Sequence, residues 1–341
     1  MKKIILTGGG TGGHVFPALA LLPKLKDKFD VFYIGSNGME KNILSNFKDI
    51  PYLEIPASKL ERKFSLKIFL LPFKLLVSIH KAKKHLKEVK PDIIFSKGGF
   101  VAVPVVIAAW LLKIPVVSHE SDLTFGLANK IILRFSKKMC TNFLETAKRT
   151  KKGVHTGAPI REQIFKGNKK QFFSGSKPTL LILGGSLGAL KINQAITENI
   201  DMLLSKFNII HITGKNKTKI EKTGYHQIEF TNNIEDFYAT ANYVISRAGA
   251  GVIFELLALQ KPTLLIPLSK ACSRGDQIDN AKKFKEMGYA EVLFEEDLSA
   301  KTLNQKLNNL IQNKEKHIEN MQKYPKNKGV DNIVKLIELL S

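Results

Sequence analysis

Three glycine-rich turns follow short apolar runs and carry residue types that bind phosphate. They are residues 7–13 (Thr-Gly-Gly-Gly-Thr-Gly-Gly), residues 96–100 (Ser-Lys-Gly-Gly-Phe) and residues 184–189 (Gly-Gly-Ser-Leu-Gly-Ala). Glycine lets the backbone approach a ligand closely, and a helix that follows offers unpaired N–H groups to an anion. Each turn alone could be a simple connection between a strand and a helix. Because all three stand at predicted strand ends, recognition of a phosphate-bearing ligand explains them better.

The first turn also satisfies a weaker motif. Gly8, Gly10 and Gly13 have the GxGxxG spacing of dinucleotide-binding proteins. That fingerprint requires an acidic residue at the end of the second strand to hold the ribose, and residues 33–36 read Tyr-Ile-Gly-Ser. None of the turns has the GxxxxGK[ST] form of a P-loop. The turns therefore argue against a nicotinamide cofactor and against a P-loop nucleotidase.

Two side chains near these turns are candidate general bases. Glu120 ends a buried predicted strand, where a carboxylate points into the crevice of an α/β sheet. His14 ends the first turn, and histidine side chains titrate near neutrality. The alternatives are that Ser121 or Asp122 caps the following helix, and that His14 only donates a hydrogen bond. The residues leave open which of the two groups is the base.

The second half of the chain carries the candidate nucleotide contacts. Residues 246–250 (Ser-Arg-Ala-Gly-Ala) end a strand and open a helix that contains Glu255, whose carboxylate can accept both hydroxyls of a ribose. The alternative is that Glu255 only stabilises the helix N-terminus. Gln277 follows a later strand and can reach the same nucleotide, and Arg161 can clamp a diphosphate with two parallel hydrogen bonds.

Composition limits the partners and the compartment. The chain has 53 Lys and Arg residues against 30 Asp and Glu residues, a net charge of +23, which favours anionic partners unless it is only a Lys-rich bias. Its two cysteines form no CxxC pair, so a disulfide framework or a zinc site is not expected and a reducing compartment is. The first apolar run ends after three residues, which predicts a strand rather than a signal peptide.

One segment suits a membrane surface. Residues 59–90 contain ten Lys and Arg residues against Glu61 and Glu88, and bulky apolar residues alternate with these cations over 64–76. This mixture predicts that residues 64–90 lie on an anionic bilayer, and the alternative is a core helix with a solvated Lys face. Nucleic acid is not expected as a partner, because apolar bulk exceeds aromatic and polar readout groups. The apolar stretch 101–117 is broken by two prolines and a lysine, so we expect a buried helix and a strand there.

Strands and helices alternate in two series, which predicts two α/β domains with parallel sheets. A single helix is expected over residues 15–28 and a loose polar stretch over 166–178. Strands are expected at residues 3–7, 31–34, 92–96, 115–118, 179–183, 208–212, 243–246 and 263–266.

Together these motifs resemble the MurG-type peptidoglycan glycosyltransferases over essentially the whole chain. The motifs that carry the resemblance are GGTGGHVFP at 9–17, GGF at 98–100, HE at 119–120, GGSLGA at 184–189, SRAGA at 246–250 and DQxxNA at 276–281. The resemblance implies a GT-B fold, in which two doubly wound Rossmann-like domains face each other across a cleft. Residues 1–160 would form the acceptor and membrane-facing domain, residues 161–325 the UDP-sugar domain, and a helix at about 326–341 would pack back on the first.

The resemblance also implies an activity. The family transfers N-acetylglucosamine from UDP-N-acetylglucosamine (UDP-GlcNAc) to the C4 hydroxyl of the muramoyl-pentapeptide of lipid I, giving lipid II for peptidoglycan synthesis. The transfer inverts the anomeric centre and requires no metal or other cofactor. The expected partners are UDP-GlcNAc, lipid I and an anionic membrane surface, and the expected location is peripheral, on the cytoplasmic face of the inner membrane.

Site residues carry over position by position. The resemblance implies catalytic roles for His14 and Glu120, substrate contacts from Thr11, Gly12, Gly13, Asp122, Arg161, Ser186, Thr231, Ala250, Gly251, Val252, Glu255 and Gln277, acceptor-side contacts from Gly98, Gly99 and Phe100, and no metal ligand. Among these, Glu255 would hold the ribose, and Ser186 and Arg161 the diphosphate.

Four positions depart from the family pattern. Asp122 and Ser121 stand where the family has Asn and Gln, Ala158 replaces an Asn, and Phe100 replaces a Tyr. Only the change at Asp122 adds a charge, beside the expected diphosphate.

Other functions remain compatible with parts of the sequence. A related synthase that glycosylates diacylglycerol would share the donor site, so its acceptor distinguishes it. A UDP-GlcNAc 2-epimerase of the same fold would not need the basic apolar segment. A non-catalytic basic protein that binds membranes or nucleic acid would not need Glu255.

Overall fold

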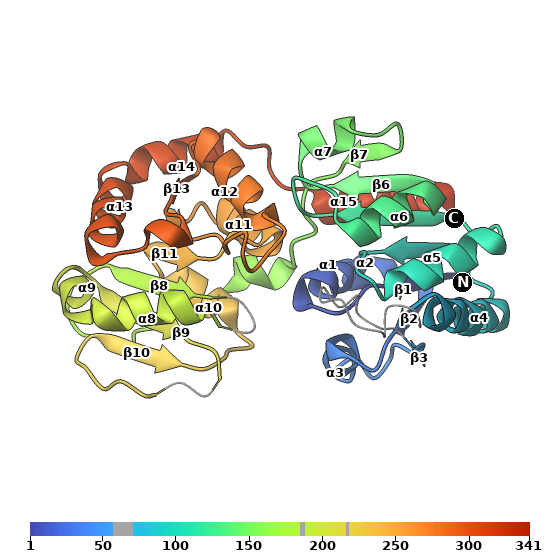
Figure 1. The fold of residues 1–341 in the computed structure, drawn as a ribbon, viewed down its shortest axis with the longest axis horizontal. Coiled ribbons are helices and arrows are strands. Elements are labelled where there is room, and N and C mark those ends of the chain that lie inside the picture. The colour runs from blue at the N-terminus through green and yellow to red at the C-terminus, as the bar shows by residue number, and fades with distance from the viewer. Residues whose placement is uncertain (57–70, 185–187, 216–217) are drawn as a thin grey trace. The chain divides into compact units, whose positions relative to one another are not determined.

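The computed structural model describes residues 1–56, 71–184, 188–215 and 218–341, and its strands form two sheets (Figure 1). The chain divides into two compact units. Unit 1 consists of Met1–Arg161 and Lys328–Ser341, and unit 2 consists of Glu162–Asn327. All strand pairs within each sheet are parallel. The predicted pair of doubly wound α/β domains is therefore confirmed.

Unit 1 contains a seven-stranded sheet in the order β3-β2-β1-β4-β5-β6-β7. Its strands are β1 (Lys2–Thr7), β2 (Phe29–Gly35), β3 (Tyr52–Glu54), β4 (Ile93–Ser96), β5 (Val116–Glu120), β6 (Lys138–Thr141) and β7 (Gly153–His155). Its helices are η1 (Gly12–His14), α1 (Phe16–Leu19), α2 (Leu22–Leu25), α3 (Met39–Leu44), α4 (Leu71–Val89), α5 (Ala102–Leu111), α6 (Leu127–Phe135), α7 (Leu144–Lys148) and α15 (Gly329–Leu340).

Unit 2 contains a six-stranded sheet in the order β10-β9-β8-β11-β12-β13. Its strands are β8 (Thr179–Leu183), β9 (Asn208–Ile212), β10 (Tyr225–Ile228), β11 (Tyr243–Ser246), β12 (Thr263–Leu265) and β13 (Ala290–Val292). Its helices are η3 (Glu162–Lys166), α8 (Leu190–Glu198), α9 (Ile200–Lys206), α10 (Ile234–Thr240), α11 (Ala250–Ala258), α12 (Asp276–Glu286), η4 (Glu295–Asp297), α13 (Ala300–Gln312) and α14 (Lys314–Gln322).

The strand order explains where the glycine turns lie. In unit 1 the order reverses between β1 and β4, and Thr7 pairs with Ser96 at the carboxyl ends of these strands. In unit 2 it reverses between β8 and β11, where Leu183 pairs with Ser246. Ligands of open α/β sheets bind in the crevice at such a switch point. The turns that follow all four strands therefore stand where ligands of this fold class bind.

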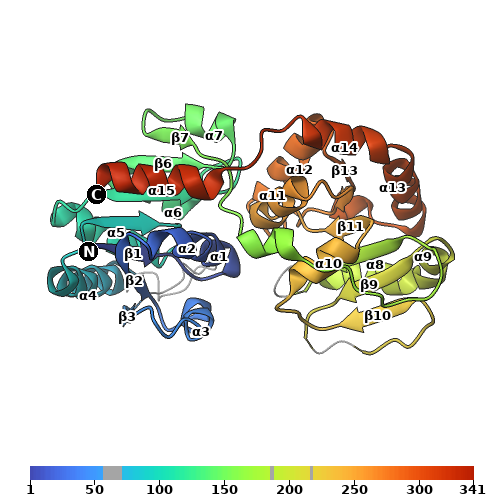
Figure 2. The same cartoon turned by 180° about the vertical axis from the view of Figure 1, so that it is seen from behind.

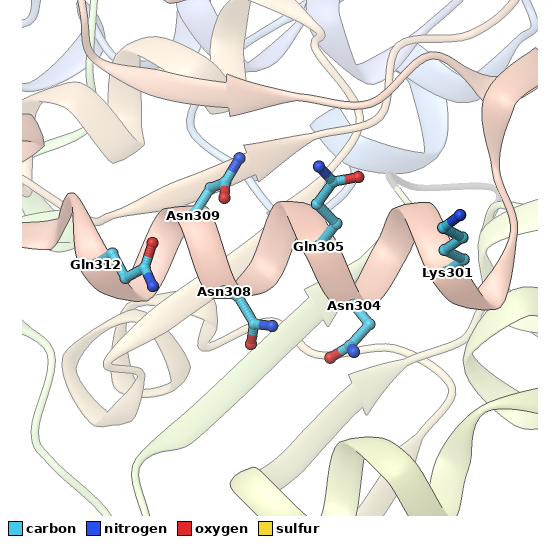
Figure 3. A pocket seen from close by; sticks show the side chains of 6 residues that line it. All are labelled: Lys301, Asn304, Gln305, Asn308, Asn309 and Gln312. Carbon is cyan, nitrogen blue, oxygen red and sulfur yellow. The ribbon is translucent and has the colours of Figure 1, made fainter.

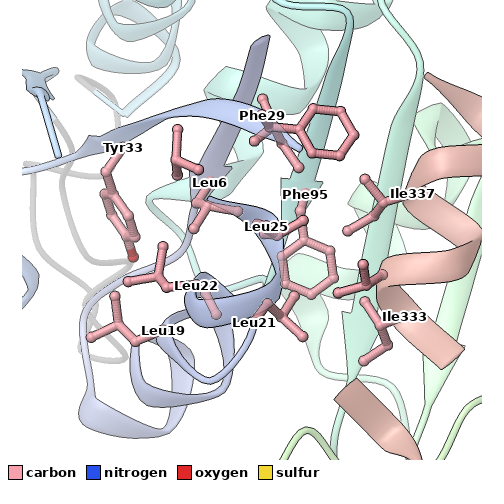
Figure 4. Close-up of a cluster of buried hydrophobic side chains, with 14 of the residues drawn as sticks. Leu6, Leu19, Leu21, Leu22, Leu25, Phe29, Tyr33, Phe95, Ile333 and Ile337 are labelled. Atoms are coloured by element: carbon pink, nitrogen blue, oxygen red, sulfur yellow. The ribbon is translucent and has the colours of Figure 1, made fainter. Parts of the chain in front are cut away.

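Two apolar layers cover the sheet of unit 1. One layer packs α4, α5 and α6 on one face through residues such as Ala82, Val106 and Ile132. The other contains α1, α2 and the last helix, α15, whose Ile333 and Ile337 lie beside Phe95 and Leu25 (Figures 2 and 4). The last helix of the chain thus belongs to the core of unit 1.

Two expectations about local structure were wrong. The single helix expected over residues 15–28 is divided into α1 and α2, because Pro23 has no N–H to donate to the carbonyl of Leu19. The polar stretch 166–178 is not loose. Asn168 N donates to Asp236 Oδ1 at 2.7 Å, and the Phe172 ring stacks on Phe237 with centroids 5.4 Å apart. Strands β3, β6, β7, β10 and β13 were not predicted, since most of them are short edge strands with weak apolar patterns.

Candidate active site

The first two glycine turns pack tightly on each other at the β1–β4 switch point. A Cβ atom built on Gly10 would stand 2.4 Å from Phe100 Cε1, and one on Gly99 would stand 2.6 Å from the Gly9 carbonyl oxygen. Gly10, Gly98 and Gly99 also have positive φ angles of 86°, 90° and 81°. Only glycine satisfies both the conformation and the space at these positions.

His14 lies at the end of this packed turn, at the last residue of η1. Its Nδ1 is 3.2 Å from Thr11 Oγ1, and its backbone N–H donates to the Thr11 carbonyl at 3.0 Å. The side chain is half-buried, and the preceding Gly13 is exposed. The nearest atom to a Cβ built on Gly13 is Thr11 Oγ1 at 3.8 Å, so a ligand can approach the backbone there.

The second candidate base, Glu120, is engaged within the fold. Its carboxylate is 5% exposed and accepts hydrogen bonds from Asp122 N at 3.1 Å, Gly126 N at 3.0 Å and Asn129 Nδ2 at 2.9 Å. These bonds hold the loop between β5 and α6. The carboxylate thus shapes the loop that carries Asp122.

Two further buried side chains, Lys97 and His119, accompany Glu120, and sequence reasoning assigned neither of them a role of its own. Burial lowers the pKa of Lys97, while the negative charges of Glu120 and Asp122 partly raise it. Burial also lowers the pKa of His119 well below its usual value, and the charge of Lys97 adds to that effect. The extra carboxylate at Asp122 is therefore accompanied by a buried cation that interacts with it.

The turn after β11 in unit 2 is open where the unit 1 turns are packed. Apart from chain neighbours and the backbone of α11 itself, no heavy atom of the described residues lies within 4 Å of a Cβ atom built on Gly249 or Gly251. Gly249 is the N-cap of α11, with φ −68° and ψ 134°, a conformation that any residue adopts. Glu255 stands one turn into this helix, and Tyr238 Oη donates to its Oε2 at 3.3 Å. Ala250, Gly251 and Val252 form the first turn of the helix, whose N–H groups have no intrahelical acceptor.

A buried salt-bridge network holds the loops around α11, and the sequence patterns did not indicate it. Arg247 pairs with Glu295 and donates to the carbonyls of Ile266 at 3.2 Å and Pro267 at 3.3 Å. Glu295 also pairs with Lys191 of α8 at 3.2 Å, and its side chain is only 2% exposed. This salt-bridge network joins the segments that follow β8, β11, β12 and β13. Its members are up to 104 positions apart in the chain (295 − 191), so no local pattern could reveal it.

In unit 2, the other residues of the predicted nucleotide-binding motifs form hydrogen bonds within loops. Gln277 Oε1 accepts from Leu268 N at 3.0 Å, and the fully buried Asn280 donates to the Ala248 carbonyl at 3.2 Å. Thr231 Oγ1 accepts from Asn233 N at 3.0 Å just before α10. Ser186 lies outside the described residues.

Arg161 ends unit 1, where its guanidinium lies over the Phe16 ring, 5.3 Å from the centroid. Stacking on a ring orients a guanidinium, and a guanidinium binds carboxylate or phosphate groups with parallel hydrogen bonds. The unit 1 candidates thus gather around the β1–β4 turns and α1. In unit 2, Ala250, Gly251, Val252 and Glu255 share α11, whereas Thr231 and Gln277 bond to residues of other loops.

Three further features of the described residues concern metal ligands, a surface groove and helix length. The described part of the chain contains no group of three His, Cys, Asp or Glu side chains that could hold a metal ion. An open groove runs along α13 and is lined by five amide side chains and Lys301 (Figure 3). That groove brings together no acid, base or nucleophile. No helix within the described ranges is long and apolar enough to cross a membrane.

Comparison with known proteins agrees over the whole chain. Residues 4–141 match the glycosyltransferase family 28 N-terminal domain, and residues 179–337 match the C-terminal domain of that family. A Clostridium tetani protein is 54% identical over 350 positions, which cover 99% of this chain and 98% of that protein. It is named UDP-N-acetylglucosamine--N-acetylmuramyl-(pentapeptide) pyrophosphoryl-undecaprenol N-acetylglucosamine transferase. A Clostridium botulinum protein of the same name is 52% identical over 99% of both chains.

Solved structures give the same fold. The Acinetobacter baumannii MurG structure aligns with a TM-score of 0.78 at 26% identity and covers 99% of this chain and 100% of that one. A glycosyltransferase of kitacinnamycin has a TM-score of 0.77 at 13% identity, covering 99% and 98%. A UDP-N-acetylglucosamine 2-epimerase from Listeria monocytogenes has a TM-score of 0.70 at 13% identity, covering 99% and 96%. The last two similarities concern the fold alone.

Proposed function

This chain belongs to the MurG-type branch of glycosyltransferase family 28, and from that premise we propose that it transfers N-acetylglucosamine from UDP-GlcNAc to lipid I. The product is lipid II, the disaccharide precursor of peptidoglycan. The observation that carries this proposal is the 54% identity to a transferase of that name along nearly the full length of both chains. The matched positions cover 99% of this chain, and 54% identity over that length is evidence for a shared activity as well as a shared fold.

We assign the donor to unit 2. The N-terminus of α11 offers N–H groups and a positive dipole end to an anion, and the open space at Gly249 and Gly251 lets a ligand reach the backbone. Glu255 accepts the ribose hydroxyls, and Gln277 holds the neighbouring loop. The other donor contacts in unit 2 are assigned to Thr231, Ala250, Val252 and Ser186, and Arg161 of unit 1 is assigned to the diphosphate.

We assign the acceptor and the proton transfer to unit 1. Glu120 already accepts three hydrogen bonds, so removing a proton from a substrate would disrupt the loop that it holds. His14 is half-buried beside the exposed Gly13, and Thr11 orients its ring. The C4 hydroxyl gives its proton to His14 as its oxygen attacks the anomeric carbon, and UDP leaves with the bonding electrons. Attack opposite the leaving group inverts the anomeric centre.

The acceptor contacts follow from the same assignment. Gly98, Gly99 and Phe100 line the acceptor side, and Thr11, Gly12 and Gly13 in the adjoining turn supply backbone groups that approach the donor sugar and its diphosphate. Asp122 lies beside Lys97, so its charge is partly balanced at this end of the sheet.

Charge on the departing diphosphate is neutralised by protein groups in this scheme. Helix N–H groups and Arg161 stabilise negative charge that develops at the leaving group. We therefore propose that transfer requires no metal ion and that activity survives EDTA. Complete loss on chelation, restored by a divalent ion, would overturn this part of the scheme.

The described part of the basic apolar segment supports peripheral attachment to the cytoplasmic face of the inner membrane. On α4, Phe73, Leu76 and Val77 are 69%, 62% and 58% exposed, and Lys74 and Lys81 are exposed beside them. Residues 64–70 of the predicted segment lie outside the described residues. Cations near an anionic surface contribute about 1 kcal/mol each, and apolar side chains add a part that salt does not screen.

Vesicle binding tests this attachment. Serine at Phe73, Leu76 and Val77 should abolish the salt-resistant binding to phosphatidylglycerol vesicles and leave UDP affinity unchanged. These side chains are exposed, so the variant should fold. Binding that persists at high salt in the folded variant would contradict the assignment.

The decisive experiment for the function is an assay with labelled UDP-GlcNAc and a lipid I analogue. Formation of the β-linked disaccharide lipid supports the proposal. Transfer to diacylglycerol alone would identify a glycolipid synthase, and conversion of UDP-GlcNAc to UDP-N-acetylmannosamine without a lipid product would identify an epimerase.

A further inference from the structure

Glu40 is a fully buried carboxylate beneath the first glycine turn, and the proposed function does not use it. It lies on α3, a short helix after β2, and is 0% exposed. Its Oε2 accepts from Gly10 N at 3.0 Å, and its Oε1 accepts from Ser36 N at 2.9 Å and from Ser36 Oγ. All three donors are uncharged. Burial of a carboxylate is costly even when it is hydrogen-bonded, so a purely structural role would be served better by a neutral side chain.

The first turn is built around this carboxylate. A Cβ atom on Gly9 would stand 2.6 Å from Glu40 Cδ, so Gly9 is required by the close approach of Glu40. At the start of the turn, Tyr33 Oη donates to the Gly8 carbonyl at 2.7 Å. Burial raises the pKa of Tyr33 well above its usual value, and the charge of Glu40 adds to the increase. Tyr33 thus stays a neutral donor, and the turn is held at both Gly8 and Gly10.

These bonds decide which part of the turn can meet a ligand. The Gly10 N–H points to Glu40, away from any anion at the sheet edge. The positive φ angle of Gly10 then redirects the chain toward Thr11 and His14. The exposed residues are Thr11 and Gly13, and Thr11 in turn orients His14. Residues 8–10 of the turn are therefore fixed by contacts within the protein, and residues 11–13 are the part that can face a ligand.

We propose that Glu40, together with Tyr33, is a positioning residue that fixes the first glycine turn so that His14 is presented for proton transfer. This inference rests on the proposed function, because it takes His14 as the base. Glu40 acts through Gly10 and Thr11 and does not itself touch substrate.

The test uses Glu40→Gln with Ser36→Ala as its matched control. A glutamine has one acceptor oxygen, so its NH₂ group must face either the Gly10 N–H or the Ser36 N–H. We expect kcat to fall roughly 10- to 100-fold, the effect of a small misplacement of a catalytic group, with the KM for UDP-GlcNAc unchanged. Ser36→Ala removes one donor from the same carboxylate but leaves the Gly10 bond, so its kcat should stay near that of the unmodified protein.

The outcomes separate a positioning role from a structural one. An unchanged kcat in Glu40→Gln overturns the inference, and so does an equal loss of kcat in Ser36→Ala. If Glu40→Gln does not fold, Tyr33→Phe replaces it, because that change removes only the bond to the Gly8 carbonyl. A folded Tyr33→Phe protein with full kcat also overturns the inference.

A second readout separates this inference from the proposed function. In protein labelled with ¹⁵N-glycine, the Gly10 amide proton bonded to a carboxylate should resonate downfield. It should move upfield in Glu40→Gln and stay in place in Ser36→Ala. If the unmodified protein transfers no sugar to lipid I, the proposed function fails. The change in the Gly10 chemical shift would still show that Glu40 holds the first glycine turn in place. If the Gly10 signal does not move in Glu40→Gln, Glu40 does not hold the turn through Gly10, whatever the activity of the variant is.

Discussion

The glycine turn after β1 and the turn after β11 both stand at the switch point of their own sheet, yet their glycines are needed for different reasons. A Cβ on Gly9 or Gly10 would collide with Glu40 or Phe100. A Cβ on Gly249 or Gly251 would meet no atom within 4 Å in the described part of the chain, apart from chain neighbours and the backbone of α11. The first turn is therefore glycine-rich largely because the protein fills the space, and the second because space is left for something else.

This difference teaches how to interpret a glycine-rich motif. Both turns satisfy the same expectation from sequence, that the backbone must come close to a partner. In unit 1 the partner of the early glycines is the protein itself, and only Gly13 resembles the open glycines of unit 2. A motif alone does not distinguish the two cases, whereas the neighbours of each absent Cβ do.

The largest expected effect comes from filling a packed turn. Gly99→Ala forces alanine to a φ angle of 81° and places its Cβ 2.6 Å from the Gly9 carbonyl oxygen. Left-handed backbone and overpacking together should cost about 2–5 kcal/mol of the free energy of unfolding of unit 1. Urea unfolding followed by fluorescence of Trp110, the one tryptophan in the chain, reports on that unit. A loss under about 0.5 kcal/mol would show that the turn relaxes freely and would remove the contrast between the turns.

The second-largest expected effect is a loss of stability of unit 2 at acidic pH, caused by the buried side chain of His211. His211 is buried between Tyr225 Oη at 2.8 Å and Asn193 Oδ1 at 3.0 Å, and Asn193 holds the Thr213 carbonyl against which Gly188 packs. Burial lowers the pKa of His211 to about 4. The unfolded chain, with a histidine pKa of about 6.5, takes up the proton first as the pH falls. The contribution of His211 is thus complete above pH 6.5 and is lost progressively as the pH falls to about 4, by about 3 kcal/mol in total.

Hydrogen exchange of the β9 amides between pH 7 and pH 4 measures this loss in unit 2. His211→Gln keeps a polar side chain that does not titrate, so its stability should depend less steeply on pH over the same interval. An unchanged pH dependence in that variant would mean that other groups cause the acid instability.

The sequence predicted the turns and strand ends but not the side chains that brace them. Apolar runs followed by glycine located β1, β4, β8 and β11, because buried parallel strands are short continuous apolar segments. The bond between Gly10 and Glu40 spans 30 residues, and the Arg247–Glu295 pair spans 48. Which distant residues meet depends on strand order and on helix placement. These contacts therefore became visible only once the two sheets were assembled.

Loss of the ribose contact is the third effect and tests the open turn directly. Glu255→Ala should weaken UDP-GlcNAc binding by roughly 1–3 kcal/mol, the range for hydrogen bonds to a charged group. Calorimetric titration with UDP measures the change. Glu255 is half-buried on α11 beside Tyr238, so Tyr238→Phe serves as a control that removes the 3.3 Å bond but keeps the carboxylate. Equal affinities in the unmodified protein and in Glu255→Ala would exclude Glu255 from the donor site.

The smallest effect on stability is the sharpest test of the comparison, because it should separate stability from binding. Gly251→Ala adds a methyl group in the first turn of α11, where the described residues place no atom within 4 Å of it beyond its own helix and chain neighbours. Alanine favours the helix, so the free energy of unfolding should rise by up to about 1 kcal/mol. UDP affinity should nevertheless fall, because the methyl group occupies the space assigned to the nucleotide. Gly249→Ala, at the N-cap, should also lower affinity, and its stability should change by less than about 1 kcal/mol. If both variants bind UDP as tightly as the unmodified protein, the open space at this turn is not the donor site. Ligand binding would then not be the reason for the glycines at positions 249 and 251.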